Sequence, residues 1–243
     1  MRTSQRTLLL AIAPAALAAC GFEEGKGGAG IAGQTSFDLS AASVSMICDF
    51  TNGDDSINDP RVGYWYAVSD GTPGGTQQPP ENGDFVPETS CGLSNADGNP
   101  VPGCAHTTGH GWADWGAGLA FDFNSPGDIA LAYDASAYTG IVFAARGRPP
   151  FKLAVPTVAT SAKESGGTCV PTAYAATSDC EDHFGVMINV QPQWLYFVVP
   201  FAALSQEGFG QRVSFDPKTS LGLQFTADPN LDFDFYITNV AFY

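Results

Sequence analysis

Apolar residues recur at every second position in many short segments of this chain. From about residue 40 onward, these segments are rich in aromatic and β-branched residues and end at Gly, Pro, Asp or Asn. No long segment shows the period of a helix. The sequence therefore predicts an all-β fold with two antiparallel sheets packed as a β-sandwich. The predicted strands lie within residues 43–50, 61–68, 115–123, 140–148, 151–158, 183–190, 194–201, 221–228 and 233–243.

The segment 115–123 carries mostly large apolar side chains on one side, the heavy side, and mostly very small side chains on the other, the bare side. Its heavy side should face the opposing sheet and carries Trp115, Ala117, Leu119, Phe121 and Phe123. Its bare side carries Gly116, Gly118, Ala120 and Asp122. Two explanations stay open. The small residues form the low floor of a groove on the outer face, or they let a loop or a neighbouring side chain cross closely.

The length and the charge of the chain limit the classes of function that the protein can have. The 243 residues suffice for one sizeable β domain and a leader. Charged residues make up 14% of the chain, and the formal net charge is −15. Such a surface repels phosphate backbones, so we expect no nucleic acid partner.

The first 19 residues are predicted to be a signal peptide, because Arg2 and Arg6 precede a short apolar run. The run ends in "LAAC", which resembles the bacterial lipobox and predicts lipidation of Cys20. The alternative is an ordinary secretory signal with an incidental Cys. We expect a lipidated Cys and flexible Gly-rich tether over 20–40 and the folded domain over 41–243. Gly21 favours the outer membrane or cell surface, where the lipid is the only membrane anchor.

The remaining cysteines predict two disulfides, because an exported chain meets an oxidising compartment. Cys91 and Cys104 bracket one polar loop, and Cys169 and Cys180 bracket another. Proximity alone suggests these pairs, and five cysteines allow other choices. Cys48 lies in an apolar run and is expected to be a buried free thiol.

Three segments resemble a group of bacterial jelly rolls. These are "WYAVSDGTPGG" (65–75), "WLYFVVPFAAL" (194–204) and "DFYITNVAFY" (234–243). Together they resemble carbohydrate-binding module family eleven and the complex I intermediate-associated protein family. The resemblance spans about residues 43–243 and implies a galactose-binding-like jelly roll.

Alternation within the strands also indicates which polar and aromatic side chains face solvent. The outward set that we expect to bind a poly- or oligosaccharide consists of Trp194, Tyr196, Arg146, Gln224 and Tyr236. Sugar C–H faces stack on aromatic rings, and planar polar groups pair with sugar hydroxyls. For Trp194 and Tyr196, packing under an end loop is an equally open interpretation. The long segment from Asp70 to Pro102 is expected to cover one end of the sandwich.

The sequence gives limited support for a metal site. His106 and His110 lie in an extended segment, about 13 Å apart, which is too far to share one zinc ion. Jelly rolls of the resembled type often hold a structural Ca²⁺, for which Asp49, Asp54, Asp55 and Asn239 are the candidate ligands. Two positions that are acidic in those relatives are neutral here, which weakens this prediction.

The sequence thus favours a lipid-anchored carbohydrate-binding protein without catalytic activity. It contains no nucleophile elbow and no phosphate-binding Gly loop. Two alternatives remain: an envelope protein with a structural or protein-interaction role on the same fold, and a glycan-active enzyme with loop carboxylates.

Overall fold

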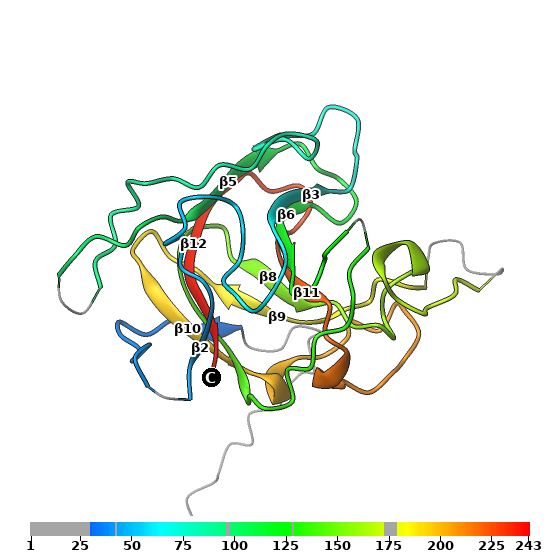
Figure 1. The fold of residues 1–243 in the computed structure, drawn as a ribbon. Helices are drawn as coiled ribbons and strands as arrows, with labels where there is room; N and C mark the ends of the chain where they lie inside the picture. Colours follow the sequence, from blue (N-terminus) through cyan, green and yellow to red (C-terminus); the bar gives the residue numbers. More distant parts are fainter. Residues whose placement is uncertain (1–29, 42, 96–97, 128, 173–178) are drawn as a thin grey trace, which may run out of the picture.

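The computed structural model describes residues 30–41, 43–95, 98–127, 129–172 and 179–243 as a two-layer β-sandwich (Figure 1). This architecture confirms the predicted fold class. Sheet A has the strand order β1 (Ile31–Ala32), β9 (Phe184–Asn189), β8 (Phe151–Val155), β11 (Gly222–Ala227), β6 (Ala117–Asp122) and β3 (Trp65–Ser69). All its neighbours are antiparallel except β1 and β9, which are parallel.

Sheet B has the order β10 (Leu195–Pro200), β7 (Gly140–Arg148), β12 (Phe233–Phe242), β5 (Ala105–His110) and β4 (Thr76–Gln78), with β2 (Ser45–Cys48) paired to the end of β12. Three short 3-10 helices lie in the connections: η1 (Lys163–Ser165), η2 (Phe201–Ala203) and η3 (Pro217–Thr219). All nine predicted strand segments contain a strand. The strands β1, β4 and β5 lie outside the predicted segments, although the segment that holds His106 and His110 was expected to be extended.

The core lies between the sheets and is dominated by aromatic rings. Phe143 of β7 contacts Phe225 of β11 with ring centroids 5.4 Å apart, and Phe123 contacts Phe242 at 5.1 Å. These rings are buried. Phe123 stands at a position that the alternation assigned to the core, whereas Phe242 faces the core beyond a register shift within β12. Burying each one stabilises the fold by about 1.5–3 kcal/mol before conformational entropy is counted.

The prediction for Trp115 is wrong, because its side chain is 47% exposed. The regular strand starts only at Ala117. Gly116 has φ +100°, so the alternation breaks directly after Trp115. The Asp70 carboxylate fixes this bend by accepting the backbone N–H groups of Asp114, Trp115 and Gly116 at 2.8–3.1 Å.

Both predicted disulfides are present, Cys91–Cys104 and Cys169–Cys180. Cys48 is a buried free thiol, as predicted, and burial raises its pKa to about 12. The segment 70–102 does not simply cover one end of the sandwich. It contributes β4 to sheet B, and its disulfide-closed part, 91–104, packs on the outer face of that sheet.

The N-terminal predictions lie mostly outside the described residues, including the signal peptide and Cys20. Ile31 and Ala32 pair with Ile188 and Asn189, so the segment predicted as a tether, 20–40, contains residues that belong to sheet A. Within the described ranges, no helix is long and apolar enough to cross a membrane.

Candidate functional site

A pocket of about 320 Å³ opens on the outer face of sheet A, where β3 and β6 lie side by side. We call it the tyrosine pocket, and its lining residues are Tyr64, Tyr66, Asp122, Ser125, Pro126 and Gly127. The strand pattern explains the two rings. Trp65 and Ala67 face the core, so Tyr64 and Tyr66 must face outward. Their side chains are 54% and 38% exposed.

The ring of Tyr66 lies over the neighbouring strand. Tyr66 is paired with Ala120 on β6, yet its hydroxyl donates to Oδ1 of Asp122, two residues further along, at 3.1 Å. To make this bond the phenol ring must lean across β6, above the small side chain of Ala120. Ala120 is fully buried although it faces outward, which fits such a cover. The hydrogen bond holds the ring as a fixed, partly exposed aromatic surface.

The electrostatics of the tyrosine pocket follow from this burial. Desolvation, together with the adjacent Asp122 carboxylate, raises the pKa of Tyr66, so its hydroxyl stays protonated and remains a donor. Desolvation also raises the pKa of Asp122, against the opposing effect of hydrogen bonds from Tyr66 and Ser125. The second carboxylate oxygen and the hydroxyl of Ser125 provide further polar groups at the pocket.

Two features of the structure explain the small side chains on the bare side of β6. At Gly118 an added Cβ would lie 1.9 Å from the carbonyl oxygen of Phe225, so close approach of β11 requires glycine there. At Ala120 the small side chain leaves room for the ring of Tyr66. Gln224 lies on the other side of Ala120 in the same row. Two inter-strand spacings separate Tyr66 from Gln224 at the backbone, about 10 Å.

The predicted ligand-binding residues do not form one site. Gln224 lies on the outer face of sheet A, whereas the other four lie on sheet B. Arg146 stands over the rings of Tyr236 and Trp194, 4.1 and 5.4 Å from their centroids. Trp194 and Tyr236 pack under the disulfide segment 91–104, and Trp194 Nε1 donates to the carbonyl of Cys91 at 2.8 Å. Trp194 therefore follows the second interpretation, packing under a loop, although on a face of the sandwich.

Tyr196 lies apart from this cluster. Its backbone pairs with Gln34, and its hydroxyl accepts from Asn239 Nδ2 at 3.4 Å. Asn239 is thereby directed toward Tyr196, away from the other candidate calcium ligands. Asp49 and Asp54 accept hydrogen bonds from nearby Thr51 and Ser56, as turn residues do. Burial raises the pKa of Asp55. Among the described residues, no group of three or more His, Cys, Asp or Glu side chains is arranged to hold a metal ion.

None of the residues that line the tyrosine pocket was among the predicted ligand-binding residues. The alternation that identified other outward residues applies equally to "GYWYAV", where Trp65 and Ala67 face inward. Asp122 stands on the bare side of its strand and was noted only as part of that side. The signal for Tyr64 and Tyr66 was present, but their proximity to Asp122 depends on the pairing of β3 with β6.

Comparison with known proteins gives structural neighbours only. No protein-family model and no curated protein matches the sequence. The family 11 carbohydrate-binding module of the cellulosomal cellulase Lic26A-Cel5E of Clostridium thermocellum is 12% identical, covering 83% of this chain and 95% of its own, with a TM-score of 0.48. The family 30 module of the C. thermocellum cellulase Cel9D-Cel44B is 13% identical, covering 82% and 97%, with a TM-score of 0.47.

A C. thermocellum family 11 module in complex with a β-1,3-1,4-mixed-linked tetrasaccharide is also similar, at 12% identity, 82% and 94% coverage and a TM-score of 0.47. Family 11 is one of the two families that the sequence segments resemble. At this identity the likeness concerns the shape of the domain, and no ligand follows from it.

Proposed function

We propose that this protein binds a carbohydrate in the tyrosine pocket and does not hydrolyse it. The observation that carries the proposal is the ring of Tyr66, held across β6 by its bond to Asp122 beside the exposed ring of Tyr64. A fixed ring with an accessible face is suited to stack on the apolar C–H face of a pyranose. The Asp122 carboxylate and the Ser125 hydroxyl line the same pocket and can accept hydrogen bonds from sugar hydroxyls.

The charge of the protein favours a neutral glycan. With a formal net charge of −15, the surface repels polyanions such as uronate polymers at long range. Asp122 adds a local carboxylate at the pocket itself, which accepts hydrogen bonds from hydroxyls but repels anionic groups. The ligand class that we propose is therefore an uncharged oligo- or polysaccharide.

Isothermal titration calorimetry with neutral oligosaccharides tests this proposal. The panel should include the β-1,3-1,4-mixed-linked tetrasaccharide found with the family 11 module. We expect Tyr66→Ala to weaken binding roughly tenfold or more, since it removes the central aromatic contact. Phe209→Ala is a matched control, because Phe209 is 55% exposed and lies outside the pocket.

Binding that is equally strong in both variants would refute the assignment of the site. Failure of every neutral glycan to bind at millimolar concentration would instead refute the function. Release of reducing sugar from any bound glycan would show that the protein is an enzyme.

We also propose that Cys20 is lipidated and anchors the protein to the outer membrane or cell surface. This rests on the order of basic leader, apolar run and "LAAC" in the sequence. Labelling of cells with an alkyne-modified fatty acid should mark the protein but not its Cys20→Ala variant. Equal labelling of the two forms would exclude this anchor.

A further inference from the structure

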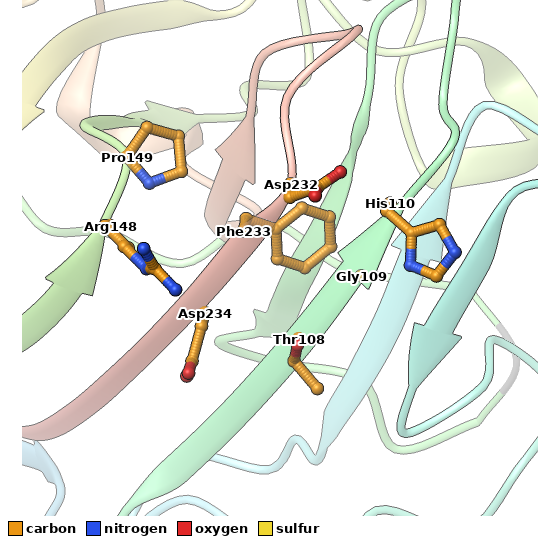
Figure 2. A pocket seen from close by; sticks show the side chains of 8 residues that line it. All are labelled: Thr108, Gly109, His110, Arg148, Pro149, Asp232, Phe233 and Asp234. Atoms are coloured by element: carbon orange, nitrogen blue, oxygen red, sulfur yellow. The ribbon is translucent and has the colours of Figure 1, made fainter.

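A second pocket, of about 360 Å³, lies on the outer face of sheet B, on the opposite side of the sandwich from the tyrosine pocket. Figure 2 shows its side chains around one hollow: Arg148 ends β7, Asp232 and Asp234 stand at the start of β12, and Thr108 and His110 come from β5. We call it the arginine pocket. None of its lining residues was among the predicted ligand-binding residues.

The strand register explains why these side chains meet. Asp234 is paired with Arg148 on one side and with Thr108 on the other, so the three stand in one row across neighbouring strands. Successive strands are about 4.8 Å apart, so the row spans about 10 Å. Phe233 and Phe235 are buried in the core, which directs Asp234 outward.

The arginine pocket carries charges of both signs, from Arg148 and from Asp232 and Asp234. Among the described residues, Arg148 makes no ion pair, so its guanidinium is available to a ligand. Asp234 accepts from Nε2 of His106 at 2.9 Å, and Nδ1 of the same ring contacts Glu88. The His106 ring thus links Asp234 on β12 to Glu88.

The presence of both signs of charge selects the chemistry of the ligand. An anion would meet two carboxylates, and a cation would meet the guanidinium of Arg148. Neighbouring hydroxyl groups on a sugar suit both, because each hydroxyl can donate to a carboxylate and accept from a guanidinium N–H. The hydroxyl of Thr108 and the ring of His110 extend the same alternation of donors and acceptors.

We propose that the arginine pocket is a second carbohydrate site, which binds vicinal hydroxyls of an uncharged sugar. The inference extends the carbohydrate binding proposed for the tyrosine pocket. Two sites on opposite faces allow one molecule to bridge two glycan chains, and simultaneous engagement raises the apparent affinity for a polysaccharide.

NMR titration of the ¹⁵N-labelled protein with glucose, galactose, mannose and xylose tests the proposal directly. We expect at least one of these sugars to shift the amide resonances of Thr108, Arg148 and Asp234. Arg148→Ala should weaken this binding roughly tenfold, and Arg148→Lys should weaken it as well, because Lys keeps the charge but lacks the guanidinium fork. Arg212→Ala should leave it unchanged, since Arg212 is an exposed arginine outside the arginine pocket.

The outcomes separate the two sites. Shifts confined to the tyrosine pocket would overturn the second site and leave the proposed function intact. Shifts confined to the arginine pocket would support the second site and overturn the assignment of the first. Saturable binding of glucuronate or inorganic phosphate at Arg148, with no response to the neutral sugars, would overturn the proposed ligand class.

Discussion

Two aspartates of this protein have pKa values that are shifted in opposite directions. Asp122 is partly buried with few donors around it, and desolvation raises its pKa. Asp70 is also partly desolvated, but hydrogen bonds from Thr72 and from the backbone of Asp114 and Gly116 outweigh this and lower its pKa to about 2. The first aspartate belongs to the proposed ligand site, and the second anchors the loop before β6.

Asp122→Asn should remove a pH-dependent loss of stability. Because the folded-state pKa of Asp122 lies above its usual value of 3.8, its contribution to stability is fully present below that value and declines as the pH rises through the folded-state pKa. The asparagine cannot ionise. We therefore expect the free energy of unfolding of the variant, relative to wild type, to increase from acidic to neutral pH. Urea unfolding at several pH values measures this, and a difference independent of pH would contradict it.

Asp70→Ala should destabilise the protein by about 2 kcal/mol at neutral pH, since three backbone N–H groups lose their acceptor. The sign of the pKa shift predicts that this contribution is present above pH 3.8 and is lost as the pH falls toward about 2. Denaturant unfolding at neutral and strongly acidic pH tests both statements. An equal cost at both pH values would show that the carboxylate charge has no role.

The disulfide-closed segment 91–104 shows how an irregular element covers a sheet. Leu93, Val101 and the disulfide pack on Trp194 and Tyr236, and Thr238 donates to the carbonyl of Gly103 at 2.8 Å. His106 adds a polar link, since it contacts Glu88 next to this segment and Asp234 on β12. Trp194 and Tyr236 are covered in this way, so an aromatic residue that is predicted to face outward need not belong to a ligand site.

Replacing Cys91 and Cys104 together by Ser should lower the free energy of unfolding by about 3 kcal/mol. It should also shift the fluorescence of Trp194 to longer wavelength, because the ring gains contact with water. The Trp194 signal is obtained by difference from the Trp194→Phe variant. The matched change at Cys169 and Cys180 should destabilise the fold without altering Trp194. An unchanged Trp194 spectrum in both double variants would contradict this description of the cover.

Prediction from the sequence yielded the orientation of side chains within single strands, but it could not give the arrangement of the strands in the two sheets. Alternation placed Leu119, Phe121 and Phe123 in the core, because side chains of one strand alternate whatever its neighbours are. It could not show that Gln224 and Trp194 lie on opposite faces, since strand order depends on contacts distant in the chain. Trp115 failed for a local reason, the positive φ of Gly116, which only the bend stabilised by Asp70 explains.

The part of the chain that the structure describes is a two-sheet sandwich, and each outer face carries a polar pocket, the tyrosine pocket on sheet A and the arginine pocket on sheet B. The tyrosine pocket pairs an oriented ring with a carboxylate, and the arginine pocket combines hydrogen-bond donors and acceptors. Tyr66 and Asp122 of the first pocket and Arg148 and Asp234 of the second belong to regular strands that pack on the aromatic core. Positions fixed in this way suit binding of a ligand to a largely preformed surface.

A crystal structure of the protein with its tightest-binding neutral oligosaccharide tests the central claim most directly. We expect a pyranose ring stacked on Tyr66, with a sugar hydroxyl within hydrogen-bonding distance of Asp122 and the aromatic side chain of Tyr64 in contact with the sugar. A sugar bound without contact to either Tyr64 or Tyr66 would contradict it.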